Sequence, residues 1–171
     1  MNTHNTTGEL GLELVKIMED LTWERHGQIG VENAKRNLPF IIGGQSISAL
    51  RNLKVGDGDS AVVIAAGPSI KRHDPIATIK AANYQGAIIA TESSLSYCLR
   101  NGIIPDLTIT LDPHATRIVR WFGDPSLTKK SLKEDDYFSR QDMDSAFADE
   151  MQANREILDL LNRHGHKIKI A

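Results

Sequence analysis

The stretch Ala61-Val-Val-Ile-Ala-Ala-Gly-Pro-Ser69 determines the fold that the sequence predicts. The apolar residues before its Gly-Pro-Ser corner are small or β-branched and follow one another without a break. Such a run is typical of a parallel strand buried on both faces. At the corner, Gly67 can take a positive φ, Pro68 stiffens the backbone and Ser69 offers a hydroxyl. Because ligands of open α/β sheets bind outside the carboxyl ends of the strands, we expect this corner to belong to a ligand site.

Two more short apolar segments, residues 86–91 and 107–111, predict further strands with helices between them. Asp74-Pro75 resembles an N-cap with a first-turn proline, and Gly102 is well placed to end the second helix. About five residues then separate the Gly-Pro-Ser corner from the first helix, unlike the tight turn of a dinucleotide fingerprint. Alternation at this spacing predicts right-handed crossovers, and hence an α/β, Rossmann-like, three-layer parallel sheet.

Residues 1–54 predict a helical lead-in to the sheet domain, which we expect over residues 55–171. Between Glu9 and Leu21 the apolar side chains repeat at helical spacing. The turn-rich cluster at residues 55–60 marks the expected boundary. We expect the lead-in to pack on the sheet.

The chain after the third strand predicts a loop, a helix and a last strand. Residues 123–136 are polar with mixed charge and predict a mobile loop. Ser139 with Asp142 resembles a capping box, which opens a long amphipathic helix that Gly165 ends. The chain then stops within an apparent strand, residues 166–171, so we expect an edge strand or a sheet truncated at its C-terminus.

Composition excludes several classes of function. A formal net charge of −2 gives no basic field for nucleic acid. Cys98 is the single cysteine and lies on an apolar stripe, so we expect it in the core and exclude a disulfide or cysteine metal cage. No stretch is long enough to span a membrane, and a cytoplasmic location is expected by default. The absence of phosphate-loop, H-E-x-x-H, G-x-S-x-G and G-x-G-x-x-G motifs weakens the standard nucleotidase, protease, esterase and NAD hypotheses.

Polar residues follow each of the three predicted strands and are expected to meet at one edge of the sheet. The segments are Gly67-Pro68-Ser69, Thr91-Glu92-Ser93-Ser94 and Asp112-Pro113-His114. The middle segment also begins a helix, whose free N–H groups and dipole favour anions. We therefore expect a ligand that carries phosphate or carboxylate, with Arg117 and Arg120, one helical turn apart, as a candidate phosphate clamp.

Ordinary structural roles are an alternative for each of these residues. The Gly-Pro-Ser corner could be a strand-to-helix turn without a role in ligand binding. Residues such as Ser93 and Ser94 are more often helix caps than ligand donors. Asp112 at a strand end often caps the following turn. His114 alone is more often a surface histidine than a base, and paired arginines usually form a solvated helix face.

Four segments taken together resemble a known family of domains. They are residues 61–70, 86–91 and 111–112, and Asn101-Gly-Ile-Ile-Pro-Asp106. The combination is similar to the MptE-like domain shared by archaeal 6-hydroxymethylpterin pyrophosphokinases and motility-associated factor (Maf) flagellin glycosyltransferases. The resemblance is clear over residues 55–114 and looser over the lead-in.

Resemblance to the Maf enzymes implies a glycosyltransferase that uses a CMP-activated, sialic-acid-like sugar and a protein acceptor such as flagellin. By analogy with bacterial sialyltransferases, the Gly-Pro-Ser corner would hold the nucleotide, with residues 91–94 and 112–114 closing around it. Asp112 or His114 would act as the base. Glu92 and Asp112 stand near positions where that pattern has asparagines, which is a departure from it.

Resemblance to the pterin enzymes instead implies ATP, Mg²⁺ and transfer of a diphosphate to a pterin alcohol. Carboxylates at Glu92 and Asp112 suit an oxygen-liganded Mg²⁺, with Asp112 as its ligand. In either enzyme, residues 123–136 would close over the substrate. A third hypothesis is a module that binds a nucleotide or a protein partner without catalysis. The residues leave these alternatives open.

Overall fold

The computed structural model describes residues 6–139 and 149–171, and the chain divides into two compact units. The first unit covers Met1–Ser46 and the second covers Ile47–Ala171. This division lies close to the boundary expected after residue 54. No helix of the described residues is long and apolar enough to cross a membrane.

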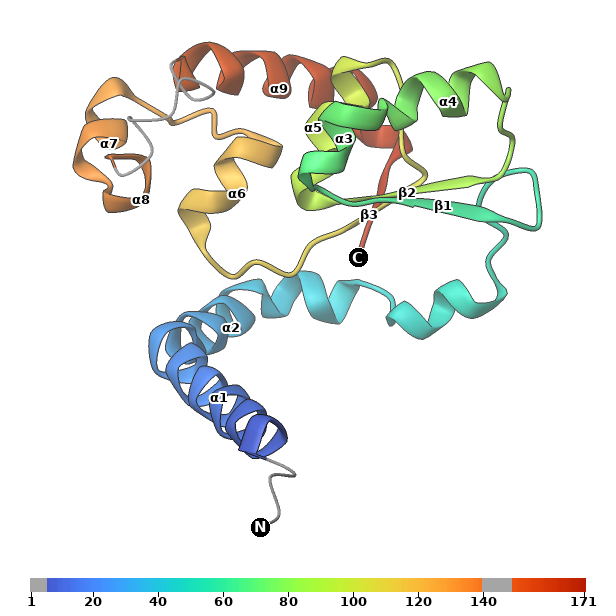
Figure 1. Ribbon diagram of the computed structural model, residues 1–171. Helices are drawn as coiled ribbons and strands as arrows, with labels where there is room; N and C mark the ends of the chain where they lie inside the picture. The colour runs from blue at the N-terminus through green and yellow to red at the C-terminus, as the bar shows by residue number, and fades with distance from the viewer. Residues whose placement is uncertain (1–5, 140–148) are drawn as a thin grey trace. The chain divides into compact units, whose positions relative to one another are not determined.

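The first unit is one helical segment interrupted by a π-helical turn. α1 (Thr6–Thr22) runs into this turn, η1 (Trp23–Gly27), and η1 runs into α2 (Gln28–Gly43). The backbone stays right-handed helical through η1, and the segment bends there (Figure 1). The lead-in is therefore helical, as predicted, and it continues well beyond the stripe that ends at Leu21. Its packing on the sheet stays a prediction.

The second unit is built on a four-stranded parallel sheet in the order β1-β2-β3-β4. Ile64 of β1 aligns with Ala90 of β2, which aligns with Thr108 of β3. This arrangement confirms the predicted α/β, Rossmann-like fold with a parallel sheet. The strands are β1 (Ala61–Ile64), β2 (Ala87–Thr91), β3 (Leu107–Ile109) and β4 (Lys169–Ile170).

The helices that connect neighbouring strands lie on the same face of the sheet (Figure 1). Right-handed crossovers between consecutive, adjacent strands require this placement. A third layer therefore stays a prediction. The helices between the strands are α3 (Pro68–His73), α4 (Pro75–Ala81), α5 (Glu92–Arg100), α6 (Ala115–Phe122), α7 (Lys129–Glu134), α8 (Asp136–Ser139) and α9 (Glu150–His164). The 3₁₀ segment η2 (Ile47–Asn52) precedes β1, and the 3₁₀ segment η4 (Gly165–Lys167) follows α9.

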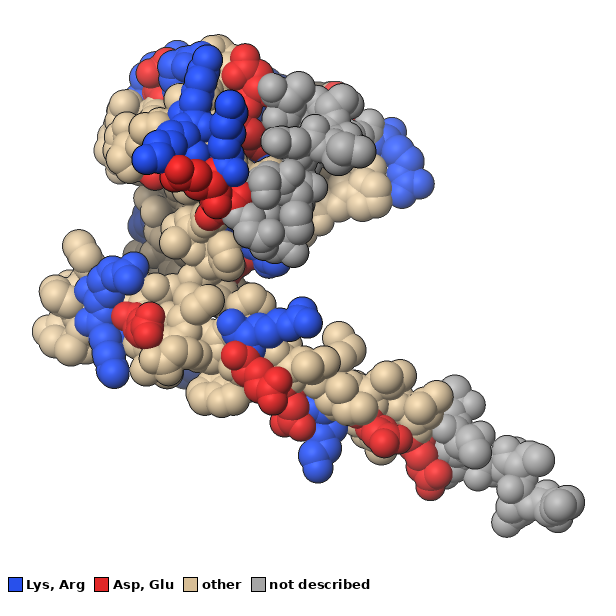
Figure 2. Space-filling view, turned by 90° about the vertical axis from the view of Figure 1, so that its left-hand side faces the viewer, with Lys and Arg blue, Asp and Glu red and all other residues tan. Residues whose placement is uncertain are grey.

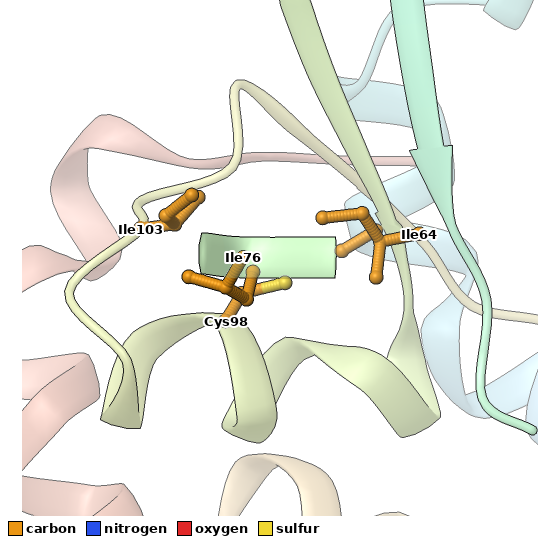
Figure 3. Packing of buried hydrophobic residues seen from close by; sticks show 5 residues of the cluster. Ile64, Ile76, Cys98 and Ile103 are labelled. Atoms are coloured by element: carbon orange, nitrogen blue, oxygen red, sulfur yellow. The ribbon is translucent and has the colours of Figure 1, made fainter. Parts of the chain in front are cut away.

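Two clusters of buried apolar side chains hold the helices on the sheet. One joins β1, β2, α4 and α5, and Figure 3 shows Ile76 and Cys98 together between Ile64 and Ile103. The other joins α5 to α9 through Leu95, Leu99 and Ile157. α5 contributes to both clusters, so it is the central helix of this unit.

The segment of residues 101–106, which carries part of the family resemblance, serves the fold. Gly102 has a φ of +73° and follows the end of α5, as predicted. Asp106 Oδ2 accepts the N–H of Ile88 at 2.8 Å, and the Asp106 N–H donates to the Ile88 carbonyl at 2.8 Å. Asp106 therefore ties the start of β3 to β2 with both backbone and side chain.

The Gly-Pro-Ser corner differs from the expectation in two respects. Gly67 has a φ of −173°, which is extended backbone, so no positive φ is needed there. α3 begins at Pro68, directly after Gly67, so the expected gap of about five residues before a helix is absent. The fixed φ of proline suits the first helical turn, which explains this early start. The predicted start of α4 is confirmed, because Asp74 Oδ1 accepts the N–H of Ala77 at 3.2 Å.

The prediction of a loop over residues 123–136 is wrong for Lys129–Glu134, which form α7. Thr128 caps α7 through reciprocal bonds with Ser131, and the segment reaches the start of α8. Gly123 ends α6 with a φ of +75°, where a Cβ would lie 2.7 Å from Leu158 Cγ. Local side-chain caps thus stabilise short helices within a polar stretch.

The start predicted for the last helix, at Ser139 and Asp142, falls in part outside the described residues. Within them, Asp149 caps α9, since its Oδ1 accepts the N–H of Gln152 at 2.9 Å. Gly165 ends α9, as predicted. β4 then pairs in parallel with β3, which confirms a final strand. The strand is shorter than the predicted residues 166–171, because Gly165–Lys167 form η4.

Cys98 provides a direct test of how α5 packs on the sheet. Its side chain is fully buried, and burial raises the pKa of the thiol to about 11. We expect a disulfide reagent such as DTNB to label the native protein only as fast as it unfolds, and the denatured chain at once. Native labelling as fast as that of denatured protein would contradict this packing.

The same thiol has a measurable pH signature. Burial raises the pKa of this thiol from its ordinary value of 9.0 to about 11, so the folded protein binds more protons than the unfolded chain between these values. The free energy of unfolding should therefore fall as pH rises through this range, by about 1.4 kcal/mol per pH unit from this group. In Cys98→Ala the decline should be shallower; identical slopes would show that the thiol is not buried.

Asp106→Ala should lower the free energy of unfolding by about 1–3 kcal/mol, because the Ile88 N–H loses a charged acceptor. Asp106→Asn keeps an acceptor and should cost less. Urea unfolding measures both. Asp59→Ala, in an exposed turn, is the control, and an Asp106→Ala protein as stable as this control would refute the structural role.

Candidate functional site

Three strand-end segments meet at the carboxyl edge of the parallel sheet. We define this carboxyl edge by residues 65–69, 91–94 and 110–114, which follow β1, β2 and β3. The strand register places them side by side, and α3, α5 and α6 begin there (Figure 1). The topology therefore brings together the segments in which the sequence places its candidate ligands.

The segment after β1 offers the most accessible groups of the edge. Gly67, Pro68 and Ser69 are all exposed. A cavity of about 250 Å³ lies beside Ser69 and is lined mainly by apolar side chains of β1 and α3. The Ser69 hydroxyl and the start of α3 are thus open to solvent.

In the segment after β2, one serine is buried and supports the fold, while the residues before it are partly accessible to solvent. Ser94 is fully buried, and its hydroxyl lies within hydrogen-bond distance of the Ile64 and Thr91 carbonyl oxygens. Ser94 therefore ties α5 to the end of β1 beneath the edge. Ser93 and Glu92 are half-buried at the start of α5, and the Thr91 hydroxyl lies 3.3 Å from the Ser93 hydroxyl.

Asp112 organises the segment after β3. Its Oδ1 accepts the N–H of His114 at 2.8 Å, which fixes the turn into α6. Its Oδ2 lies 3.3 Å from Nη1 of Arg117 in an ion pair. The Asp112 side chain is 15% exposed and that of Arg117 is 46% exposed, so Arg117 faces solvent from the rim of the edge.

The ring of Tyr137 lies close to two arginine side chains and to the ring of His114. The guanidinium carbons of Arg120 and Arg117 lie 5.0 Å and 5.7 Å from the centre of its ring. The His114 ring lies 6.0 Å from it. The sequence analysis missed Tyr137, which comes directly after the stretch expected to form a mobile loop. No local motif marks it.

Asp135 anchors Tyr137 to the rest of the cluster. Its Oδ2 accepts the Thr116 hydroxyl at 2.9 Å, and its Oδ1 accepts the N–H of Tyr137 at 2.8 Å. Burial by itself raises the pKa of Asp135, but these hydrogen bonds outweigh it and leave the pKa below its ordinary value. Asp135 is thus held as a carboxylate that fixes α8 against α6.

Arg117 and Arg120, the predicted phosphate clamp, occupy different surroundings. Arg120 is 10% exposed and forms an ion pair of 2.5 Å with Glu150 at the start of α9. It lines a cavity of about 220 Å³ among α5, α6 and α9, which Ser93 also lines. Arg117 is the more accessible cation, and Arg120 connects the edge to this cavity.

The described residues offer a divalent cation only part of a coordination shell. No three potential ligand side chains gather among them. Mg²⁺ in nucleotide sites is held by one or two carboxylates together with phosphate oxygens and water. Glu92 and Asp112, at neighbouring strand ends, fit that smaller requirement.

Comparison with known proteins identifies the family. A family model described as 6-hydroxymethylpterin diphosphokinase MptE-like matches residues 32–134, more than half of the chain. No curated protein and no solved structure matches the chain significantly. The matched range contains β1, β2, β3 and all three segments of the carboxyl edge. The chain therefore belongs to the MptE-like family.

Proposed function

We propose that the chain acts in nucleotide-dependent group transfer and binds the nucleotide phosphates at the carboxyl edge. One observation supports this most directly: an exposed corner, a helix start and an ion-paired arginine follow three adjacent parallel strands at one edge. Free N–H groups at helix starts and an accessible guanidinium are the groups that bind phosphate in proteins.

The description of the matching family favours diphosphate transfer from ATP to a pterin hydroxymethyl group. In that reaction the hydroxymethyl oxygen attacks the β-phosphorus, and the bond from that phosphorus to the oxygen bridging the α-phosphate breaks. AMP leaves, and the hydroxyl proton passes to a base on the protein. His114 and Asp112, next to each other at the end of β3, are the candidate bases.

The Asp112–Arg117 pair suits a site whose charge changes on binding. Without ligand, each charge balances the other at 3.3 Å. An arriving phosphate competes for Arg117, and the released Asp112 oxygen is then available to a cation or a proton. Mg²⁺ bound with the nucleotide would neutralise phosphate charge, with Asp112 and Glu92 as its protein ligands. Positioning and charge neutralisation supply most of the catalysis in such reactions.

A CMP-activated, sialic-acid-like sugar is the second candidate donor, with a protein such as flagellin as acceptor. The exposed Gly67-Pro68-Ser69 corner favours it, because that corner carries the resemblance to CMP-binding enzymes. Binding of a nucleotide without turnover is the third candidate. The three differ in ligand requirement, which makes them separable by binding measurements.

A thermal-shift panel with CMP, CDP, Mg-ATP and 6-hydroxymethylpterin tests these alternatives. A ligand at about a hundred times its dissociation constant should stabilise the protein by about 2.7 kcal/mol. We expect stabilisation by ATP only with Mg²⁺ if the protein transfers diphosphate, and by CMP alone if it transfers a sugar. No shift with any nucleotide would contradict nucleotide binding itself.

Arg117→Ala should weaken nucleotide binding by about ten- to a hundredfold, because a charge-assisted phosphate contact is lost. Its stability should change little, since the Arg117 side chain is 46% exposed and Asp112 keeps the hydrogen bond from the His114 N–H. Isothermal titration with the nucleotide that gives the shift measures the effect. Arg155→Ala, on the exposed face of α9, is the matched control. Equal affinities in the two variants would exclude Arg117 from the site.

A further inference from the structure

The helices of the first unit carry an apolar surface that this unit does not cover. No residue in the described range 8–43 is buried. On α1 the exposed apolar side chains recur at intervals of four, three and four residues, a spacing that forms one helical face. They are Leu10, Leu14, Ile17 and Leu21, and α2 adds Val31, Leu38 and Ile42.

The apolar surface also contains a groove, at the bend between the two helices. It measures about 560 Å³ and is lined by Val15, Met18 and Trp23 among others of α1 and η1. Trp23 is 71% exposed. Exposed tryptophans next to apolar grooves are typical anchors of protein interfaces. The surface therefore has the composition of a contact region.

Charge is divided unequally along the same helices. Residues 6–24 contain five acidic residues and one lysine, whereas residues 25–43 contain three basic residues and one acid. Figure 2 shows acidic side chains spaced along the segment that leads away from the grey N-terminal residues. The bend at η1 separates the two charged halves. Each half is therefore complementary to the other.

This division indicates which partner fits. An acidic α1 is unsuited to the anionic surface of a membrane, which attracts basic amphipathic helices. Two α1 helices facing each other would bring acid against acid. In a two-fold symmetric dimer, α1 of each chain can pack on α2 of the other. This arrangement makes two contacts, and each pairs an acidic half with a basic half. It also covers both apolar faces.

We propose that two copies of this chain dimerise through the first unit, with α1 of each copy packed on α2 of the other. Leu14 and Ile17 lie in the middle of the apolar face of α1. Trp23, beside the groove at η1, anchors the contact near the two-fold axis. The interface involves no residue of the carboxyl edge, so it is independent of the proposed function. The family match begins at residue 32, so α1 lies outside the part that defines the family.

Analytical ultracentrifugation of the full chain tests the proposal. We expect a species of twice the 18.9 kDa chain mass at micromolar concentration. The double variant Leu14→Glu/Ile17→Glu should raise the dimer dissociation constant by at least about a hundredfold. Leu111→Glu is the control, because Leu111 is apolar and 86% exposed but lies in the second unit. A wild-type monomer, or a double variant that dimerises like the control, would overturn the proposal.

Charge exchange tests the pairing of α1 with α2 and does not depend on the apolar variants folding. Glu13→Lys/Glu19→Lys should weaken the dimer by about tenfold or more, because basic side chains then face basic side chains. Adding Lys35→Glu/Arg36→Glu should restore it. Failure of this rescue, with helical content unchanged by circular dichroism, would contradict the packing of α1 on α2.

Discussion

The packing of α5 between the sheet and α9 is the interaction on which the rest of the second unit depends. One face of α5 places Cys98 against β1, β2 and α4, while Leu95 and Leu99 contact α9. Ser94 adds a buried link to the end of β1. Because α5 packs in both apolar clusters, its orientation on the sheet is fixed. Its N-terminus is therefore held at the carboxyl edge.

The carboxyl edge follows from that constraint. Parallel strands joined by right-handed crossovers end on the same side, so exposed groups from distant parts of the sequence become neighbours there. At one end of the edge, Ser69 is open to solvent. At the other end, Asp112 is held in place by its hydrogen bond in the turn and by its ion pair with Arg117. In the proposed function, a phosphate group would bind between the helix start and the guanidinium at this edge.

The sequence predicted the parts of this structure that depend on local pattern. Apolar runs located β1, β2 and β3, and Gly102 and Gly165 located helix ends, because burial and backbone freedom leave clear signals. The prediction failed at Lys129–Glu134, where a short capped helix forms within a polar stretch. Tyr137 and Glu150 could not be found, since their roles depend on tertiary contacts with Arg117 and Arg120. The site residues were predicted as neighbours, but the burial of Ser94 was not.

Hydrogen exchange measured by mass spectrometry, with and without nucleotide, tests the central claim most directly. Nucleotide phosphates at the carboxyl edge should slow amide exchange in residues 65–69, 91–94 and 110–114 together, because all three segments border one ligand. Exchange in α1 should not change, since the residues that define that edge all belong to the second unit. Slowed exchange confined to the cavity among α5, α6 and α9, or no change in these three segments under saturating nucleotide, would contradict the claim.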